Sequence, residues 1–364
     1  MAGPLSGYRI IEMGGIGPGP FAAMMLADHG AEVIRIDRPG TIWDPGDTML
    51  RSRKRLILNL KNPDDVAALR ELAKTADALI EGFRPGTMER LGLGPEALLA
   101  DNPRLVYGRM TGWGQTGPYA PYAGHDLNYI SLSGAAHSIG TADAPVPPLA
   151  LTGDMGGGGM MLAFSITAAL LNAARTGEGQ VIDCAMTEGS ALLMTAFYGL
   201  HATGGWSDER EANLLDGGAP FYRPYRTADG KFVSIGPLEP QFYRELLERL
   251  GLVDDELFAD QEDRARWPAM RERLDALFAG RTQAEWRSVL EHTDVCFAPV
   301  LSMAEAPDHP HNVARGAFVR VEGINQPAPA PRYSRSLLDH PAPPRDVSIA
   351  ELMEDGRDAD RRNR

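Results

Sequence analysis

Two short segments of the chain carry residue types that suit proton transfer. Residues 124–130 read Gly-His-Asp-Leu-Asn-Tyr-Ile, which places His125 beside Asp126. A second carboxylate, Asp154, stands just before a run of four glycines. Histidine and a carboxylate can act as acid and base near neutral pH. These residues are therefore candidates for acid/base catalysis.

The glycine run leads into an apolar segment that begins at Met160 and is predicted to be a helix. A helix N-terminus has unpaired N–H groups, so the N–H groups around residues 154–157, just before this helix, could offer donors to an oxyanion. A purely structural interpretation stays open at this point. His125 could cap a turn, Asp154 could cap the helix, and the glycines could serve only a tight backbone.

The elements around these residues alternate between strand and helix. The pattern predicts strands over 8–13, 32–37, 56–60, 78–81, 105–110 and 181–185, with helices over 20–29, 63–74 and 160–175. Such alternation is typical of the α/β class with a doubly wound parallel sheet. In this class ligands bind at the carboxyl ends of the strands.

The composition changes after the polar, glycine-rich region 206–221, where the pattern predicts a second, smaller domain. A hairpin is expected over 225–235 with its turn at Asp229-Gly230. A helix is expected over 241–250, ended by Gly251, and Thr282 with Glu285 forms a capping box before another helix. Further on, residues 325–344 are expected to be extended, 348–353 to form a short helix and 355–364 to be disordered.

Composition excludes several classes of partner. The chain has 364 residues, a hydrophobic fraction of 43% and a formal net charge of −13, which disfavours nucleic acid and anionic membranes. Its two cysteines, Cys184 and Cys296, imply neither a disulfide framework nor a metal site, and His309 and His311 have no matching ligands. No apolar stretch of about 18 residues and no signal peptide is recognised. A cytoplasmic protein without metal or membrane association is expected.

Positive charge is concentrated near the start of this acidic chain. The basic residues are Arg35, Arg38, Arg51, Arg53, Lys54, Arg55, Arg84 and Arg90. Arginine matches phosphate oxygens in a bidentate way, which favours an anionic ligand. A solvated charged face is the alternative, and the residues alone leave both open.

A nicotinamide dinucleotide site is disfavoured. Gly15, Gly17 and Asp37 imitate the spacing of a dinucleotide fingerprint. Pro20 stands where the third glycine belongs, and Pro18 and Pro20 lack the N–H groups that should face a pyrophosphate.

Four segments together resemble the family III CoA transferases, and within that family they are most similar to the α-methylacyl-CoA racemases. The segments are 15–37, 111–118, 124–130 and 153–159. The resemblance implies a large doubly wound domain built from both ends of the chain and two subunits interlocked as a homodimer. The domains expected are a large CoA-binding domain of 1–188 plus 316–364, a linker over 189–220 and a small α+β domain over 221–315.

The resemblance also implies a function and roles for residues. Racemases of this family use a His-Asp acid/base pair, which carries over onto His125 and Asp154, with Asp126 and Glu239 supporting it. They interconvert (R)- and (S)-2-methylacyl-CoA by 1,1-proton transfer through an enolate. The CoA transferases form a mixed anhydride on an aspartate and typically lack the histidine, so His125 is the discriminating residue.

The CoA site implied by the resemblance falls on residues near the start of the chain. They are Ile16, Arg35, Arg38, Arg53, Lys54, Arg55 and Arg84. CoA is part of the substrate, so no separate cofactor is expected. Two alternatives stay open: a CoA transferase with Asp154 as the nucleophile, and a non-catalytic acyl-CoA-binding protein.

Overall fold

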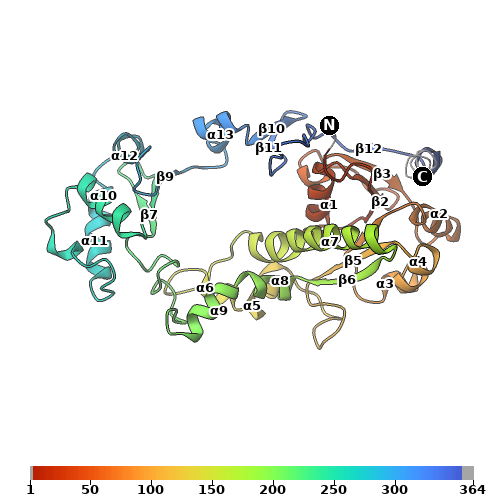
Figure 1. Cartoon of the computed structure of the whole chain (residues 1–364), viewed down its shortest axis with the longest axis horizontal. Coiled ribbons are helices and arrows are strands. Elements are labelled where there is room, and N and C mark those ends of the chain that lie inside the picture. The colour runs from red at the N-terminus through yellow and green to blue at the C-terminus, as the bar shows by residue number, and fades with distance from the viewer. Residues whose placement is uncertain (1–2, 355–364) are drawn as a thin grey trace. The chain divides into compact units, whose positions relative to one another are not determined.

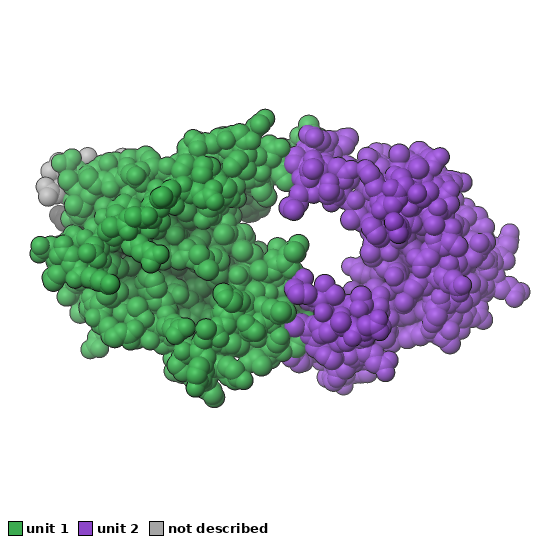
Figure 2. Space-filling model, turned by 180° about the vertical axis from the view of Figure 1, so that it is seen from behind, with its two compact units in different colours: residues 1–135, 148–195, 313–364 green, residues 136–147, 196–312 purple. Residues whose placement is uncertain are grey.

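The computed structural model of the chain describes residues 3–354 (Figure 1). The described chain forms two compact units, which Figure 2 colours green and purple. Among the described residues, unit 1 comprises 3–135, 148–195 and 313–354, and unit 2 comprises 136–147 and 196–312. The prediction for 355–364 lies outside the described residues.

Unit 1 is built on a seven-stranded sheet in which all neighbouring strands are parallel. The strands are β1 (Arg9–Met13), β2 (Glu32–Asp37), β3 (Arg53–Ile57), β4 (Ala78–Glu81), β5 (Val106–Thr111), β6 (Gln180–Ala185) and β12 (Arg345–Asp346). Their order is β12-β3-β2-β1-β4-β5-β6, so the order reverses between β1 and β4. The prediction of a doubly wound α/β fold is confirmed, and β12 brings the last part of the chain into the sheet.

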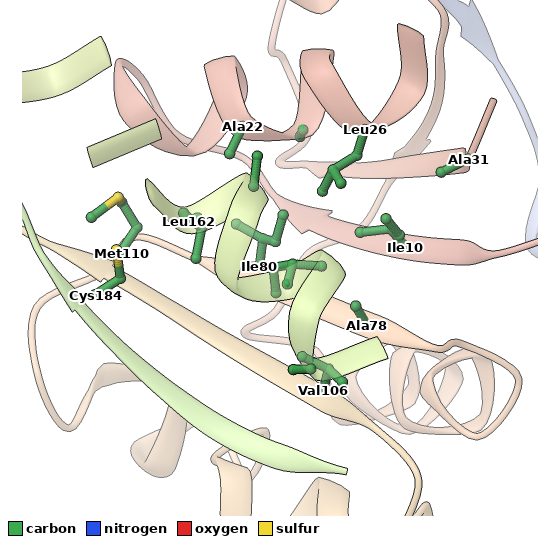
Figure 3. Close-up of a cluster of buried hydrophobic side chains, with 14 of the residues drawn as sticks. Ile10, Ala22, Leu26, Ala31, Ala78, Ile80, Val106, Met110, Leu162 and Cys184 are labelled. Atoms are coloured by element: carbon green, nitrogen blue, oxygen red, sulfur yellow. The ribbon is translucent and has the colours of Figure 1, made fainter. Parts of the chain in front are cut away.

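Helices cover both faces of this sheet. Helices α1 (Pro18–Asp28) and α7 (Met161–Thr176) pack on one face, and α2 (Pro63–Ala73), α3 (Thr87–Arg90) and α4 (Pro95–Asp101) pack on the other. Successive strand residues point to opposite faces, so Ile10 joins Ala22, Leu26 and Leu162 in one core cluster (Figure 3), while Ile11 joins the other. The strands therefore contribute buried apolar side chains to both faces of the sheet.

Strand β3 lies earlier in the chain than predicted. The prediction of 56–60 is wrong because it excluded three consecutive basic residues, which the strand in fact contains. Buried carboxylates on β1 and β2 neutralise Arg53 and Arg55, and this makes the strand compatible with a sheet interior. Strands β2 and β4 have the predicted bounds.

The glycine run is helical and not a loop. Leu151–Met160 forms a π-helix, η2, which continues directly into α7. Its glycines allow close helix packing: a Cβ on Gly157 would lie 2.5 Å from the N atom of Ser190 in α8 (Met186–Leu193), and a Cβ on Gly159 would lie 2.7 Å from Cδ1 of Phe21. The prediction that the helix begins at Met160 is therefore wrong, because packing against two neighbouring helices outweighs the low helix propensity of glycine.

The continuous helix changes one expectation about apolar stretches. Leu151–Thr176 spans 26 residues and contains an 18-residue window that is apolar enough to cross a bilayer. The expectation that no apolar stretch reaches about 18 residues is wrong, since the helix was expected to begin only at Met160. Half of that helix window is buried within the protein. The core helix of a soluble protein meets the same two criteria, so this helix is weak evidence for a membrane span.

Unit 2 contains a three-stranded antiparallel sheet and its own core. The strands are β7 (Arg223–Arg226), β8 (Phe232–Ile235) and β9 (Phe297–Val300), and the main helices are α10 (Pro240–Leu250), α11 (Trp267–Phe278) and α12 (Gln283–Leu290). The hairpin at Asp229-Gly230 is confirmed, as are the end of α10 at Gly251 and the capping box of Thr282 with Glu285.

The remaining elements are short. They are α5 (Asp126–Leu132), α6 (Ala135–Ser138), α9 (Thr195–Ala202), α13 (Pro310–Arg315), β10 (Phe318–Val321), β11 (Ile324–Pro327), and the 3-10 turns Thr48–Leu50, Glu256–Phe258 and Ala306–Asp308. Residues 349–354 are helical, close to the predicted 348–353. Residues 136–147, assigned to the large domain from the sequence, belong to unit 2, as does most of the expected linker.

Candidate active site

A histidine and two carboxylates meet in unit 1. His125 is the N-cap of α5, its side chain is exposed, and its backbone N–H donates to Oδ1 of Asn128 at 3.0 Å. Asp126, the first residue of α5, is buried, and its Oδ1 accepts the N–H of Asp154 at 2.7 Å. A Cβ on Gly153 would collide with that oxygen, so only glycine fits there. This contact joins α5 to η2.

The Asp154 carboxylate is half-buried beside the turn that follows β1. Burial raises the pKa of Asp154, the negative charge of Asp126 raises it further, and His125 acts in the opposite direction. Gly17, at φ +70°, leaves room for it, since a Cβ there would lie 3.2 Å from Oδ2 of Asp154. The carboxyl group therefore lies at the carboxyl edge of the sheet, where ligands of this fold bind.

Tyr129 supports this cluster and was assigned no role from the sequence. Its ring is buried edge-on against Trp113, with centroids 4.7 Å apart, and its hydroxyl donates to the carbonyl of Gly124. Burial and the charge of Asp154 raise the pKa of the phenol. A Cβ on Gly124 would lie 2.7 Å from Cε1 of Tyr129. The tyrosine thus holds the backbone immediately before His125, and its position in 124–130 was the available signal.

The oxyanion donors predicted after Asp154 are not free. The N–H of Asp154 donates to Asp126, and the N–H of Met155 donates to the carbonyl of Ala150 at 3.2 Å. Residues 156 and 157 lie inside η2. The prediction is wrong because the helix begins three residues before Asp154. The N–H of Asp154 is the fourth of its N-terminal N–H groups and is capped by Asp126, and residues 155–157 lie further inside the helix.

The fourth candidate in the acid/base set lies in the other unit. Glu239 is exposed and is the N-cap of α10, immediately before Pro240. The structure thus brings His125, Asp126 and Asp154 together within unit 1 and places Glu239 in unit 2.

Three of the residues assigned to a CoA site are exposed in turns after strands. Ile16 follows β1 and is 85% exposed, while Arg38 follows β2 and Arg84 follows β4. Because the sheet is parallel, all three lie at the same carboxyl edge. Ile16 and Arg84 follow β1 and β4, the two strands between which the strand order reverses, and such a switch point is the usual ligand crevice.

The other four residues assigned to CoA lie within strands and form ion pairs. The pairs are Arg35–Glu12, Arg35–Asp37, Arg53–Glu12, Lys54–Glu32 and Arg55–Asp37. Glu12 is fully buried and accepts from Arg35 at 2.5 Å and from Arg53 at 2.7 Å. These contacts join β1, β2 and β3, and they account for part of the basic run without a ligand.

Comparison with known proteins extends over nearly the whole chain. Residues 5–347 match CoA-transferase family III. The chain is 46% identical to α-methylacyl-CoA racemase of Homo sapiens over 96% of its length and 92% of the relative's, and 46% identical to that of Mus musculus over 95% and 91%. It is 32% identical to acetyl-CoA:oxalate CoA-transferase of Acetobacter aceti, with 89% and 88% covered.

A solved structure shows the same architecture. A CAIB/BAIF family protein from Brucella suis superposes with a TM-score of 0.83 at 25% identity, covering 99% of this chain and 100% of the other. The matched family and the fold agree, and the family match includes the His125–Asp154 cluster. The chain belongs to CoA-transferase family III.

Proposed function

We propose that this protein is an isomerase that interconverts (R)- and (S)-2-methylacyl-CoA thioesters. The observation that carries the proposal is the meeting of His125 and Asp154 in unit 1 of a chain whose similarity to α-methylacyl-CoA racemases extends over nearly its full length. A CoA transferase with Asp154 as nucleophile has weaker support, because the chain is less similar to the transferases and because that reaction has no use for His125.

Racemisation requires two groups that reach opposite faces of the α-carbon. One group takes the α-proton, the thioester becomes an enolate, and the other group returns a proton to the opposite face. His125 and Asp154 are the groups proposed for these steps. The raised pKa of Asp154 brings its acid and base forms closer to the neutral range in which histidine titrates, so each can serve as acid or base. Asp126 positions the backbone at Asp154, and the role of Glu239 stays a proposal from the resemblance.

The CoA site proposed here uses the exposed members of the assigned set. Arg38 and Arg84 offer guanidinium groups to phosphate oxygens, and Ile16 offers an apolar surface near Asp154. Arg35, Arg53, Lys54 and Arg55 act in this proposal through the turn and strands that they hold. Arg35, for example, donates to the carbonyl of Gly15 at 3.1 Å.

The proposal includes a homodimer in the cytoplasm. Phe164 and Leu171 are 71% and 65% exposed and lie seven residues apart on α7, on the side that does not pack against the sheet. Such an apolar stripe suits contact with a second copy, and sedimentation velocity measures the resulting mass.

For the cytoplasm the support is the pair of free cysteines, Cys184 and Cys296.

The test of function is proton exchange without an acceptor acid. In deuterated water, (S)- or (R)-2-methylacyl-CoA should gain deuterium at the α-carbon and lose optical purity, because enolate formation needs no second substrate. Mass spectrometry and chiral chromatography follow the two changes. The same enzyme with an added carboxylic acid is the control. Rapid CoA transfer to that acid, with no proton exchange in its absence, would contradict the proposed racemase activity and favour the CoA transferase activity.

Replacing Arg38 or Arg84 with alanine should weaken substrate binding more than it slows chemistry. A hydrogen bond to a charged group contributes about 1.5–3 kcal/mol, so KM should rise about tenfold or more while kcat changes little. Arg104→Ala removes an exposed arginine just before β5, at the opposite edge of the sheet, and serves as the control. If both variants bind CoA thioesters as the parent does at low ionic strength, the CoA site lies elsewhere.

A further inference from the structure

One buried arginine is tied to both sides of the turn that carries Arg84. This turn joins β4 to α3 and spans residues 82–86. Arg109, on the adjacent strand β5, is buried and lies opposite Glu81, the last residue of β4. Its Nε donates to Oε1 of Glu81 at 3.0 Å, and its Nη1 and Nη2 donate to the two carboxylate oxygens of Glu89, in α3, at 2.8 Å and 3.3 Å. A single guanidinium therefore joins the strand before the turn to the helix after it.

The contact at Glu81 continues into the turn itself. Glu81 is buried, and its second oxygen, Oε2, accepts the backbone N–H of Phe83 at 2.7 Å. The Phe83 side chain packs against the apolar cluster that α2, α3 and α4 form with the sheet. On the other side of the turn, the carbonyl of Arg84 accepts the N–H of Thr87 at 3.1 Å. The backbone around Arg84 is thus fixed, and its N-terminal part is fixed through Glu81 and Arg109.

The Arg84 side chain takes no part in this network. It is exposed, and within residues 3–354 it forms no ion pair. Arg109, by contrast, uses Nε and both Nη atoms on carboxylates. A guanidinium recognises a phosphate through a planar fork, so its affinity depends on how the backbone beneath it is oriented. A turn that is fixed before the ligand arrives also lowers the cost of ordering it on binding.

The same arrangement occurs behind the other exposed arginine of this edge. Asp37 is the last residue of β2 and immediately precedes Arg38. Its carboxylate accepts from Arg35 at 3.0 Å and from Arg55, on the neighbouring strand β3, at 3.2 Å, and both arginines are buried. At each of these two strands, a buried arginine from the neighbouring strand holds the terminal carboxylate, and an exposed arginine follows within three residues.

We propose that Arg109 is a positioning residue of the CoA site, which fixes the turn so that Arg84 meets a CoA phosphate. Arg109 itself touches no ligand, because Glu81 and Glu89 engage its donors. The inference rests on the CoA site proposed above. It does not depend on the reaction, since a racemase and a CoA transferase both bind CoA thioesters.

Charge and positioning predict opposite effects for Glu81→Gln. Removing a carboxylate near a phosphate site would by itself tighten CoA binding, because like charges repel. The amide, however, has one oxygen for two donors, the Phe83 N–H and Arg109, so the turn loses one of its ties. The dissociation constant of CoA, measured by isothermal titration calorimetry on the full-length protein, should therefore rise about 3- to 10-fold. It should not rise further than in Arg84→Ala.

Two further variants are matched to this one. Arg109→Lys keeps the charge, but an ammonium lacks the fork that reaches Glu81 and Glu89 together, so CoA should again bind more weakly. The control is Asp101→Asn, which removes the carboxylate that pairs with Arg70 at 2.7 Å between α2 and α4, on the same face of the sheet. This variant should bind CoA as the parent does.

Double variants separate positioning from a general loss of structure. If Glu81 acts through Arg84, the combination of Arg84→Ala with Glu81→Gln should bind CoA no more weakly than Arg84→Ala alone, whereas independent effects would multiply. Glu89→Ala provides the same comparison at an exposed residue, so the test does not require the Glu81 variant to fold. Removing this carboxylate should raise the dissociation constant about twofold or more.

The outcomes distinguish the CoA site from the role of Arg109. If Arg84→Ala binds CoA as the parent does, the CoA site is wrong and this inference falls with it. If Arg84→Ala binds more weakly, unchanged or tighter binding in a folded Glu81→Gln, Glu89→Ala or Arg109→Lys variant would overturn only the role of Arg109. Effects that multiply in the double variants would overturn it as well. Weaker binding in the single variants, with no further loss in the double variants, confirms it.

Discussion

Replacing either His125 or Asp154 with alanine should abolish racemisation of 2-methylacyl-CoA. One remaining base can take a proton from one face and return it to the same face, but it cannot reach the other. General acid/base catalysis contributes about 10²–10⁴-fold, so the racemisation rate should fall by at least that factor. Chiral chromatography of the thioester measures it directly.

Proton exchange should fall in a pattern that depends on the enantiomer. Each variant should lose abstraction from the enantiomer that its missing residue faces and keep some abstraction from the other. The family resemblance predicts that His125 faces (S) and Asp154 faces (R). The matched control is His311→Ala, which removes an exposed histidine from α13 and should behave as the parent does.

The pattern of four measurements decides between mechanisms. If His125→Ala racemises at nearly the parental rate, or if only Asp154 matters for both enantiomers, a nucleophilic aspartate explains the data better than two bases. The variants should fold, because the His125 side chain is exposed and Asp154 is half-buried. Circular dichroism checks this.

Glu12→Gln should cause the largest loss of stability among single substitutions in the sheet of unit 1. Glu12 is fully buried and accepts from both Arg35 and Arg53, and Arg53 has no other carboxylate partner among the described residues. Removing one partner of a buried pair leaves an uncompensated charge and costs about 3–5 kcal/mol. The free energy of unfolding of this unit should fall by that amount.

Hydrogen exchange of the β1 amides measures this free energy for unit 1 without requiring the two units to unfold together. The control is Glu71→Gln, which removes the carboxylate of an exposed pair with Lys74 on α2 and should change stability by about 0.5 kcal/mol or less. A Glu12→Gln variant as stable as this control would show that the Glu12 network is not a structural anchor.

Much of the fold follows from local features of the sequence. Strands β2 and β4 were predicted with their bounds because each has a centre of β-branched or other apolar residues and lies between turn residues. The hairpin at Asp229-Gly230 was predicted because a tight turn requires residues of these types. The alternation of strands and helices was enough for the doubly wound class. The motif at 124–130 and the isolated carboxylate of Asp154 were likewise visible as residue types and spacing.

Contacts between distant segments decided the rest. The basic residues of β3 become strand residues only because carboxylates far away in sequence, such as Glu12 for Arg53, lie beside them. The glycine run is helical because its neighbours α1 and α8 pack where side chains would otherwise stand. The same long-range packing put Tyr129 against Trp113, brought Asp126 to the N–H of Asp154, and left Arg38 and Arg84 exposed while Arg35 and Arg53 were buried. Local propensity carries no information about partners that only the folded chain brings together, so burial and ion pairing, and with them the composition of the site, were determined by the tertiary structure.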